Sequence, residues 1–404
     1  MKAVGIVVEY NPFHNGHAFH LEKTREKANA DVVIAVMSGQ FLQRGEPALL
    51  PKWSRTKMAL LAGVDIVLEL PYQFATQKAD TFAHGAVSIL ASAGCDALCF
   101  GSESGDIAAF NHTINFLESN HGEYQSRFKL HIEKGVSYPK ALSSAFNDLN
   151  PSESLVDLSK PNNILGYQYV KAIRDQNLHM KPITISRTNA GYHDEDFSSE
   201  TIASATSIRK ALFSKDGRIE NVLPYVPAAT AELLEDYYIQ AGQLHQWENY
   251  WPYLKFRLLQ STPEELRMIY EVEEGLENRI LAKVLEAESF SEFMKAIKTK
   301  RYTWTRLQRV CVHILTNTTN DEMKIRMKNP SYIRLLGMND VGRSYLNKWK
   351  LHTQIPIISK MSSYQENDIL LDIRSSRIYA LGASPAMRSK LMKMDYEQPP
   401  IYIK

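Results

Sequence analysis

The chain has 404 residues, of which 44% are hydrophobic and 23% are charged, and its formal net charge is +2. A chain of this length usually holds two domains and has room for a deep binding cleft. No run of about eighteen apolar residues occurs, so the composition excludes a membrane-spanning protein and no membrane partner is expected. The three cysteines lack metal-ligand partners at useful spacing. We therefore expect a cytoplasmic protein without a metal site built on them.

Five short apolar runs in the first 190 residues predict a parallel sheet. They are apolar on both alternating positions, which is typical of strands that helices cover on both faces. The runs are AVGIVVEY, DVVIAVMSG, DIVLELP, DALCFGSE and PITISRT. Helical patterns lie between them at residues 17–28, 52–62, 79–93 and 163–173. The fold prediction is α/β, a Rossmann-like nucleotide-binding domain with a helical insertion at residues 106–150.

The character of the sequence changes after about residue 225, near VLPYVPAA, where two prolines break the helical pattern. We predict a first domain at 1–225 and a second, mainly helical domain at 226–404. Mixed α/β signals return from Ser331 and predict a small α/β part at the end. Charge is uneven in this half, because residues 295–350 contain thirteen Lys or Arg and three acidic residues.

The first apolar run ends in GIVVEYNPFHNGH, which carries two histidines in an H-x-G-H pattern. Ligands of parallel sheets bind beyond the carboxyl ends of the strands, where this segment lies. We expect a helix to begin near His17, so that His14 and His17 meet the free N–H groups and the dipole of its N-terminus. Gly16 is expected to let a bulky ligand approach the backbone. The pattern predicts a polyphosphate site that stabilises a pentacovalent phosphorus and its departing pyrophosphate.

The segment IASATSIRKAL, residues 202–212, indicates a second phosphate-binding helix start. Ser204 and Thr206 are typical of the first residues of helices, and Arg209 follows on the first turn as a fixed cation. The structural alternative for this segment is an ordinary capped helix with a solvated arginine. For the first segment it is one histidine that caps a helix and one that packs in the core. The occurrence of both segments in one chain favours function.

These two motifs resemble those of the nucleotidyltransferase superfamily with the H-x-G-H signature. A second motif of the I-S-S-T-x-x-R type helps that superfamily bind the triphosphate, and ASATSIR matches it only at Ser204, Thr206 and Arg209. Over almost its full length the chain is also similar to the bacterial tRNA(Met) cytidine acetate ligase family. The stretches that carry this resemblance are VVEYNPFHNGH, MSGQFLQRGEPA, KPNNILGYQYV, SRTNAGYHD, TSIRKAL, TRLQR and LLGMNDVGRSYL.

The resemblance implies a ligase that uses ATP to activate acetate as acetyl-adenylate. The acetyl group would then pass to N4 of the wobble cytidine of elongator tRNA(Met), giving N4-acetylcytidine. His14, His17 and Arg209 would be catalytic, Mg²⁺ is expected with ATP, and no protein partner is implied. The implied ATP-binding residues are Val7, Val8, Glu9, Tyr10, Asn11, Pro12, Phe13, His14, Asn15, Gly16, His17, Ala18, Phe19, His20, Gly101, Asn162, Arg187, Ser204, Thr206 and Arg209.

The segment KTKRYTWTRLQR, residues 298–309, combines five cations with two aromatic residues. This composition suits phosphate contacts together with base stacking, and it predicts a tRNA-binding segment. Arg306 and Arg309 lie one helical turn apart and should point the same way. The alternative is a solvated helix face. The predicted tRNA-binding residues are Lys298, Lys300, Arg301, Arg306 and Arg309.

Two other functions remain open at this point. An adenylyltransferase that joins AMP to a small phosphorylated substrate would use the same first domain, but the additional basic and helical residues argue against it. A nucleotide-regulated RNA-binding module would need no catalysis. Exchange of pyrophosphate into ATP separates this module from both enzymes, because binding alone gives no exchange.

Overall fold

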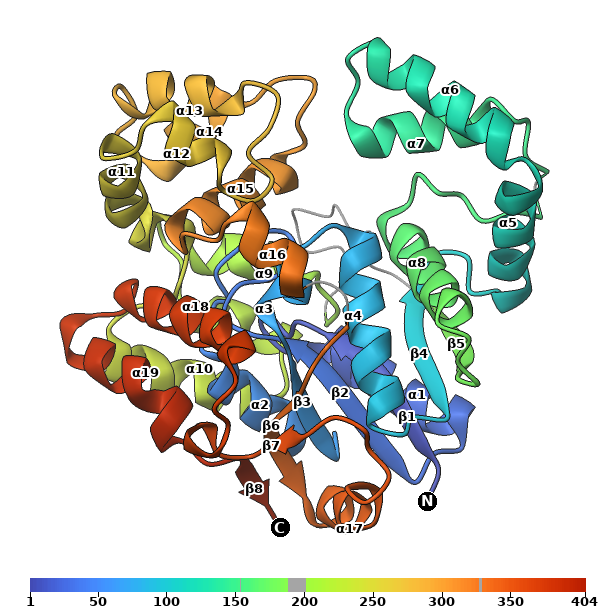
Figure 1. Cartoon of the computed structure of the whole chain (residues 1–404). Coiled ribbons are helices and arrows are strands. Elements are labelled where there is room, and N and C mark those ends of the chain that lie inside the picture. Colours follow the sequence, from blue (N-terminus) through green and yellow to red (C-terminus); the bar gives the residue numbers. More distant parts are fainter. Residues whose placement is uncertain (153, 188–200, 327–328) are drawn as a thin grey trace.

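The computed structural model describes residues 1–152, 154–187, 201–326 and 329–404. The described residues form a sheet of eight strands in the order β5-β4-β1-β2-β3-β6-β7, with β8 paired to β6 (Figure 1). Strands β1 to β5 are parallel, and β6 runs antiparallel to β3. The strands are β1 (Ala3–Val8), β2 (Val32–Ser38), β3 (Ile66–Leu70), β4 (Ala97–Ser102), β5 (Lys181–Ser186), β6 (Ile333–Asn339), β7 (Ile357–Ile358) and β8 (Ile401–Ile403).

The five predicted runs all form strands, and the predicted α/β fold is confirmed. Every residue of β2 is buried, because its Val, Ile and Met side chains pack against helices on both faces of the sheet. One face is covered by α1 (Asn15–Ala28) and α2 (Lys52–Leu61), and the other by α4 (Ala79–Ser92) and α8 (Pro161–Asp175). The chain order of the strands reverses between β1 and β4, which places a crevice at their carboxyl ends.

Three helices, α5 (Ile107–Ser119), α6 (His121–Glu133) and α7 (Tyr138–Asn147), occupy the stretch expected to be a helical insertion. None of the α6 residues is buried. The α6 and α7 helices contact each other through Phe128 and Tyr138, whose ring centroids lie 5.2 Å apart. They form an arm above the carboxyl edge of the sheet (Figure 1).

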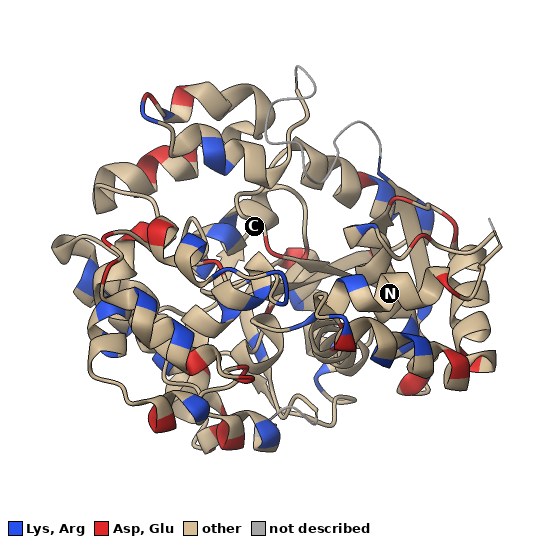
Figure 2. Ribbon diagram, turned by 90° about the horizontal axis from the view of Figure 1, so that it is seen from above, with Lys and Arg blue, Asp and Glu red and all other residues tan. Residues whose placement is uncertain are grey.

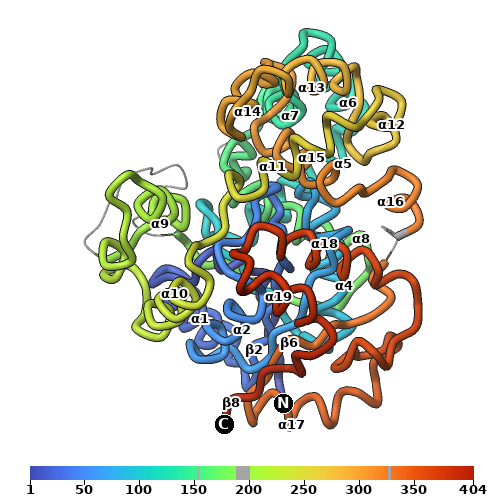
Figure 3. The backbone as a smooth tube through the Cα atoms, turned by 90° about the vertical axis from the view of Figure 1, so that its left-hand side faces the viewer, coloured from blue at the N-terminus to red at the C-terminus, as the bar shows by residue number. Residues whose placement is uncertain are grey.

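A second helical arm is built from residues 247–326, and its hydrophobic core, with Trp251 and Phe293 among its members, also takes in Phe41, Tyr72 and Tyr379 from outside the arm. It stands beside the first arm at the same end of the molecule, whereas both termini lie at the other end (Figures 1 and 3). Its helices are η2 (Trp247–Asn249), α11 (Trp251–Leu259), α12 (Pro263–Arg267), α13 (Leu276–Val284), α14 (Phe290–Ile297), α15 (Trp304–Leu315) and α16 (Asn320–Arg326).

The C-terminal residues contain strands and helices, as expected, but these strands do not form a separate part beside the helical region. Strands β6, β7 and β8 extend the N-terminal sheet instead. The physical reason is that the apolar strand β3 would otherwise be an open edge, which β6 pairs and covers. The remaining helices are α3 (Tyr72–Ala75), α9 (Ala205–Leu212), η1 (Ile219–Tyr225), α10 (Ala228–Ala241), α17 (Asp340–Trp349), η3 (Met361–Ser363), η4 (Asn367–Ile369), α18 (Leu370–Leu381) and α19 (Pro385–Glu397). Within the described ranges, every helix is too short or too polar to cross a bilayer.

Candidate active site

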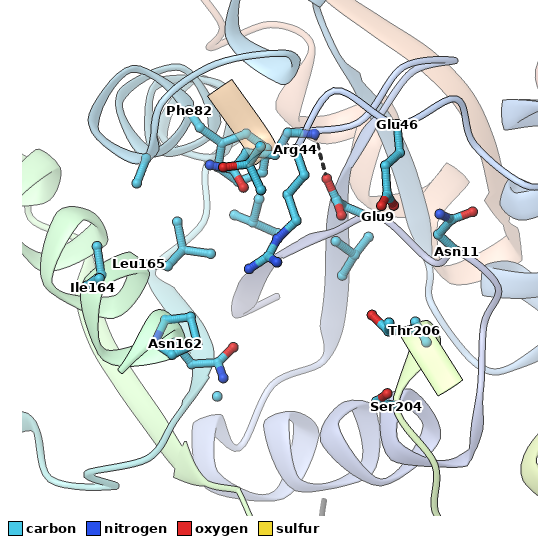
Figure 4. Close-up of a pocket in the computed structure, with 18 of the residues that line it drawn as sticks. Glu9, Asn11, Arg44, Glu46, Phe82, Asn162, Ile164, Leu165, Ser204 and Thr206 are labelled. Carbon is cyan, nitrogen blue, oxygen red and sulfur yellow. Dashed lines mark hydrogen bonds between the residues drawn. The ribbon is translucent and has the colours of Figure 1, made fainter. Parts of the chain in front are cut away.

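A cavity of about 840 Å³ opens at the carboxyl ends of the strands and contains both predicted motifs. Its floor comes from the segment after β1 and from α9, and its walls include residues of both helical arms. Tyr138 of α7 lies on one wall and Arg306 of α15 on another. Residues far apart in the sequence therefore meet around one site (Figure 4).

The two histidines of the H-x-G-H pattern form a capping box at the start of α1, in which His14 precedes the helix and His17 is its third residue. His14 is the N-cap of α1, and its Nδ1 accepts a hydrogen bond from the Gly16 N–H at 3.1 Å. The Nδ1 of His17 accepts from the His14 N–H at 3.3 Å, and the two rings stack with centroids 3.7 Å apart. Because each Nδ1 is an acceptor, we infer that the proton of each neutral ring is on Nε2. Capping and ligand binding are therefore compatible roles for these side chains.

Both imidazoles are uncharged at neutral pH. Burial, followed by the positive charges of Arg187 and Arg209, lowers the pKa of His14 to about 3. Burial also holds the pKa of His17 well below its ordinary value of 6.5. A neutral Nε2–H is a hydrogen-bond donor, so these side chains can stabilise phosphate oxygens as fixed dipoles without a proton transfer.

Gly16 lines the cavity, as the predicted approach of a ligand requires, and the structure shows a second reason for the glycine. A Cβ at Gly16 would lie 2.9 Å from Cε1 of His14. A side chain there would displace the capping ring, so the glycine is required by the packing of His14 itself.

The second motif joins the same cavity. Ser204 caps α9 by accepting from the Ser207 N–H at 3.0 Å. Arg209 donates to the Asn11 carbonyl oxygen at 3.0 Å and forms an ion pair with Glu46 at 2.8 Å. The arginine therefore ties α9 to the loop after β1 while it lines the cavity.

Three further predicted ATP-binding residues also come together. Gly101, Asn162 and Arg187 all line the cavity, and Nη1 of Arg187 lies 3.4 Å from Oδ1 of Asn162. The Asn162 side chain also donates to Glu103 at 2.7 Å, close to the start of α8. These contacts fix polar groups beyond the ends of β4 and β5.

Most of the segment from Val7 to His20 reaches the cavity. Phe13 is instead fully buried, and Asn15 donates to backbone carbonyl oxygens of Thr201 and Pro224. Two buried polar atoms lining the cavity, Nδ2 of Asn11 and Nε2 of His20, have no hydrogen-bond partner within the described residues. Such atoms are the ones a ligand can satisfy. The residues of this segment that line the cavity are Val7, Val8, Glu9, Tyr10, Asn11, His14, Gly16, His17, Phe19 and His20, whereas Pro12, Phe13, Asn15 and Ala18 support them.

The cations of the predicted basic segment differ in exposure, and its three arginines are paired with acids. Lys300 and Arg301 are exposed, Arg301 lies 3.6 Å from a carboxylate oxygen of Glu274, and Lys298 is partly buried. Arg306 pairs with Glu273 at 3.1 Å. Arg309 is 8% exposed and donates two hydrogen bonds of 2.8 Å to Glu271.

The expected phosphate contact of Arg309 is therefore not supported, because its guanidinium is buried and neutralised. The acids that neutralise the two arginines come from residues 271–273, outside the segment in which the sequence showed a charge excess. Positive and negative residues are accordingly interspersed over the molecule (Figure 2).

Sequence reasoning missed several residues of the site and one buried residue that supports it. Arg44 and Glu46 line the cavity from the loop after β2. Arg55 is fully buried in α2 and donates to the carbonyl oxygens of Glu9 at 2.7 Å and of Ser38 at 3.0 Å, so it holds the ends of β1 and β2 together. The signal for Arg44 and Glu46 was the unusual stretch MSGQFLQRGEPA, and Arg55 lies outside it. Residues 188–194 of SRTNAGYHD lie outside the described residues.

The fold and this cavity define a nucleotidyltransferase of the H-x-G-H class. Residues 1–395 match the family model described as HIGH Nucleotidyl Transferase. The chain belongs to the tRNA(Met) cytidine acetate ligase family. It is 50% identical over 403 residues to the tRNA(Met) cytidine acetate ligase of Geobacillus sp. (strain WCH70), covering 99% of this chain and 100% of the relative. Identity to the Bacillus subtilis (strain 168) protein of the same name is 48% over 405 residues, covering 99% and 97%.

Solved structures agree with this assignment. The apo crystal structure of Thermotoga maritima TmcAL matches with a TM-score of 0.92 at 33% identity, covering 100% of both chains. The structure of Thermotoga maritima TmcAL bound with alpha-thio ATP matches with a TM-score of 0.89 at 32% identity, covering 100% of this chain and 99% of that one. The family resemblance of the sequence motifs is thereby confirmed.

Proposed function

We propose that this protein activates acetate with ATP and transfers the acetyl group to N4 of the wobble cytidine of elongator tRNA(Met). The carboxylate of acetate attacks the α-phosphorus of ATP, pyrophosphate leaves, and the amine of the base then displaces AMP from the acetyl-adenylate. The observation that carries this proposal is the pair of neutral imidazoles that cap the start of α1 and line a cavity that Arg209 also lines. Family membership and the alpha-thio ATP bound by the Thermotoga relative support it.

The test uses two assays on the wild-type protein. Acetate-dependent exchange of labelled pyrophosphate into ATP should occur without tRNA. Mass spectrometry of tRNA nucleosides after incubation with ATP and isotope-labelled acetate should then show labelled N4-acetylcytidine. Exchange without transfer would favour an adenylyltransferase, and binding of ATP without exchange would favour an RNA-binding module.

We also propose that Mg²⁺ accompanies ATP and that the reaction takes place in the cytoplasm, where ATP and tRNA are found. No group of three or more His, Cys, Asp or Glu that could hold a metal was found in the described ranges. The ion would therefore be held mainly by the phosphates, as is usual for Mg²⁺ in nucleotide sites. Its role there is to neutralise charge on the leaving pyrophosphate.

Arg209→Ala should weaken ATP binding by about 1.5 to 3 kcal/mol, the range for a hydrogen bond to a charged group. We expect this loss because the guanidinium lines the cavity and is held in place by Asn11 and Glu46. Calorimetric titration with ATP in the absence of acetate measures it. Lys210→Ala is the matched control, since Lys210 is the next residue of α9 and is exposed. Equal ATP affinity of the two variants would remove α9 from the ATP site.

We propose that the exposed cations of residues 298–306 contact tRNA, while residues 1–225 carry the chemistry with ATP and acetate. The predicted boundary near residue 225 is thus proposed to separate the residues that react ATP with acetate from those that bind tRNA. The helical arm brings these cations to the rim of the cavity, since Arg306 lines it directly.

Replacing Lys300 and Arg301 together by Ala should weaken tRNA binding and make it less dependent on salt. Each lost phosphate contact should lower the log-log slope by roughly 0.7 to 0.9, so the pair should lower it by about 1.5. Pyrophosphate exchange without tRNA should persist, because neither side chain lines the cavity. Lys390→Ala with Lys393→Ala, an exposed pair on α19, is the control. An unchanged slope would show that the basic segment is a solvated face.

A further inference from the structure

A tight turn at residues 41–47 presents the charged side chains of Arg44 and Glu46 to the cavity. The turn is clamped against the helical arm: a Cβ at Gly45 would lie 2.2 Å from the backbone nitrogen of Arg309, and the glycine has a φ of +75°. The indole N–H of Trp247 also donates to the Gly45 carbonyl oxygen at 2.8 Å. The position of Arg44 beside this glycine is therefore set by packing between two parts of the fold.

Arg44 lies next to the carboxylate of Glu9. The Arg44 side chain extends into the cavity, and Glu9 lies between Arg44 and Glu46 (Figure 4). Oε1 of Glu9 accepts from the backbone N–H of Gln43 at 2.8 Å, which fixes the carboxylate. Burial raises the pKa of Glu9, and the neighbouring positive charge of Arg44 opposes this shift.

The pair lies on a particular side of the crevice. Glu9 follows β1 and Arg44 follows β2, whereas Gly101, Asn162 and Arg187 follow β4, begin α8 and follow β5. Arg209, which is ion-paired with Glu46, also lies on the side of Glu9. If the phosphates of ATP lie at the H-x-G-H helix start and at Arg209, Glu9 and Arg44 border the reacting phosphate, where the group that attacks the activated acetate must arrive.

We propose that Glu9 and Arg44 read the Watson–Crick edge of the acceptor cytosine and hold its exocyclic amine against the acetyl-adenylate. This inference rests on the proposed function and deepens it. The amine of cytosine is a donor, and its N3 and O2 are acceptors. Glu9 offers an acceptor and Arg44 offers a fork of donors, so the two side chains are complementary to that edge.

The pattern also excludes the other pyrimidine. Uracil carries an oxygen where cytosine carries its amine, and this oxygen would face the Glu9 carboxylate. Tyr270 lines the cavity and is partly exposed, so its ring is the aromatic group that can stack on a base turned out of its strand, whereas Phe82 is 3% exposed and belongs to the core. The hydroxyl of Tyr270 donates to Gln77 at 3.3 Å, close to the start of α4, on which Phe82 lies.

The transfer step is balanced by these groups. The cytosine N4 attacks the acetyl carbonyl carbon, a C–N bond forms, the bond between that carbon and the phosphate oxygen breaks, and AMP leaves with the electron pair. The proton lost by the amine passes to the Glu9 carboxylate, which can accept it while Oε1 keeps its backbone hydrogen bond.

Two variants of the full-length protein test the proposal, Arg44→Met and Arg44→Gln. Methionine removes every donor of the guanidinium and glutamine leaves only its amide N–H groups, while Glu9 is kept because it belongs to the predicted ATP-binding segment. In both variants acetyl transfer to tRNA(Met) should fall roughly 10- to 100-fold, as expected for the loss of a base-reading contact. Acetate-dependent pyrophosphate exchange should fall much less, so that acetyl-adenylate accumulates. Arg127→Met, an exposed arginine on α6, is the control.

A competition experiment gives the second readout. A tRNA(Met) transcript with uridine in place of the wobble cytidine should inhibit the wild type much more weakly than the cytidine transcript, and both variants should lose most of this difference. Equal losses of exchange and transfer, or unchanged discrimination between the transcripts, would overturn the proposal. Absence of exchange and transfer in the wild type would instead overturn the proposed function.

Discussion

His17→Ala should lower acetate-dependent pyrophosphate exchange by roughly 10²- to 10³-fold, the usual cost of removing one donor that stabilises a developing charge. The imidazole is neutral, its Nδ1 accepts from the His14 N–H, and its remaining Nε2–H is the group a phosphate oxygen can use. The ring also stacks on His14, so its loss removes support for the other imidazole. We expect the protein to stay folded, because α1 keeps its cap at His14.

The exchange assay is run beside thermal unfolding of the same preparation. His112→Ala is the control, since this histidine is exposed on α5 and does not line the cavity. A His17→Ala protein that exchanges like the wild type would remove the imidazole from the reaction. A protein that no longer folds would show that His17 is a structural residue.

Lys52→Met should destabilise the protein by about 3 to 5 kcal/mol, the range for breaking a buried ion pair from one side. Lys52 is 1% exposed and lies 2.7 Å from a carboxylate oxygen of Glu69 and 2.7 Å from one of Asp395. Burial by itself would lower the pKa of Lys52, but Asp395 and Glu69 outweigh it and raise that pKa. The substitution leaves two buried carboxylates without this cation.

The free energy of unfolding in urea at neutral pH measures this effect. Lys57→Met is the matched control, because Lys57 is on the same helix and exposed. Lys52 also helps to hold the pKa of Asp395 below its ordinary value. A carboxyl group whose pKa is lower in the folded state than in the unfolded state stabilises the folded state when the pH lies above the pKa of the unfolded state. This stabilisation is lost as the pH falls through the pKa of the folded state. The difference in the free energy of unfolding between the wild type and Lys52→Met should therefore become smaller in strong acid. Equal free energies of unfolding at neutral pH would contradict a stabilising role for the ion pairs of Lys52.

The parts of the site nearest to a strand were predictable from the sequence. H-x-G-H follows an unmistakable buried strand, and the rule that ligands meet the carboxyl ends of parallel strands then places His14 and His17 in the crevice. The cap at Ser204 was predictable as well, because serine is a preferred residue at the first position of a helix. Local signals of this kind depend on residues within a few positions of each other.

The charged segment at residues 298–309 could not be interpreted in that way. Its cations have no acidic neighbours along the chain, yet Glu271 and Glu273 neutralise Arg309 and Arg306 across the arm. The charge of a surface depends on what packs against it, and the partners of an arginine can come from any part of the chain. Arg44 was missed for the same reason, since its loop acquires a position only when Gly45 packs against α15.

The sequence by itself determined the five-strand parallel core, the two helix starts that line the cavity and the family, because each depends on local periodicity or on an uninterrupted motif. Only the tertiary structure decided that β6 closes the edge beside β3, that two helical arms wall the cavity, and that Arg44 and Glu46 lie around it beside the predicted Glu9 and Arg209. The physical reason is that burial, ion pairing and edge closure are settled between surfaces that are distant in the chain. A one-dimensional pattern specifies which face of an element is apolar, but it does not specify which other element will cover that face.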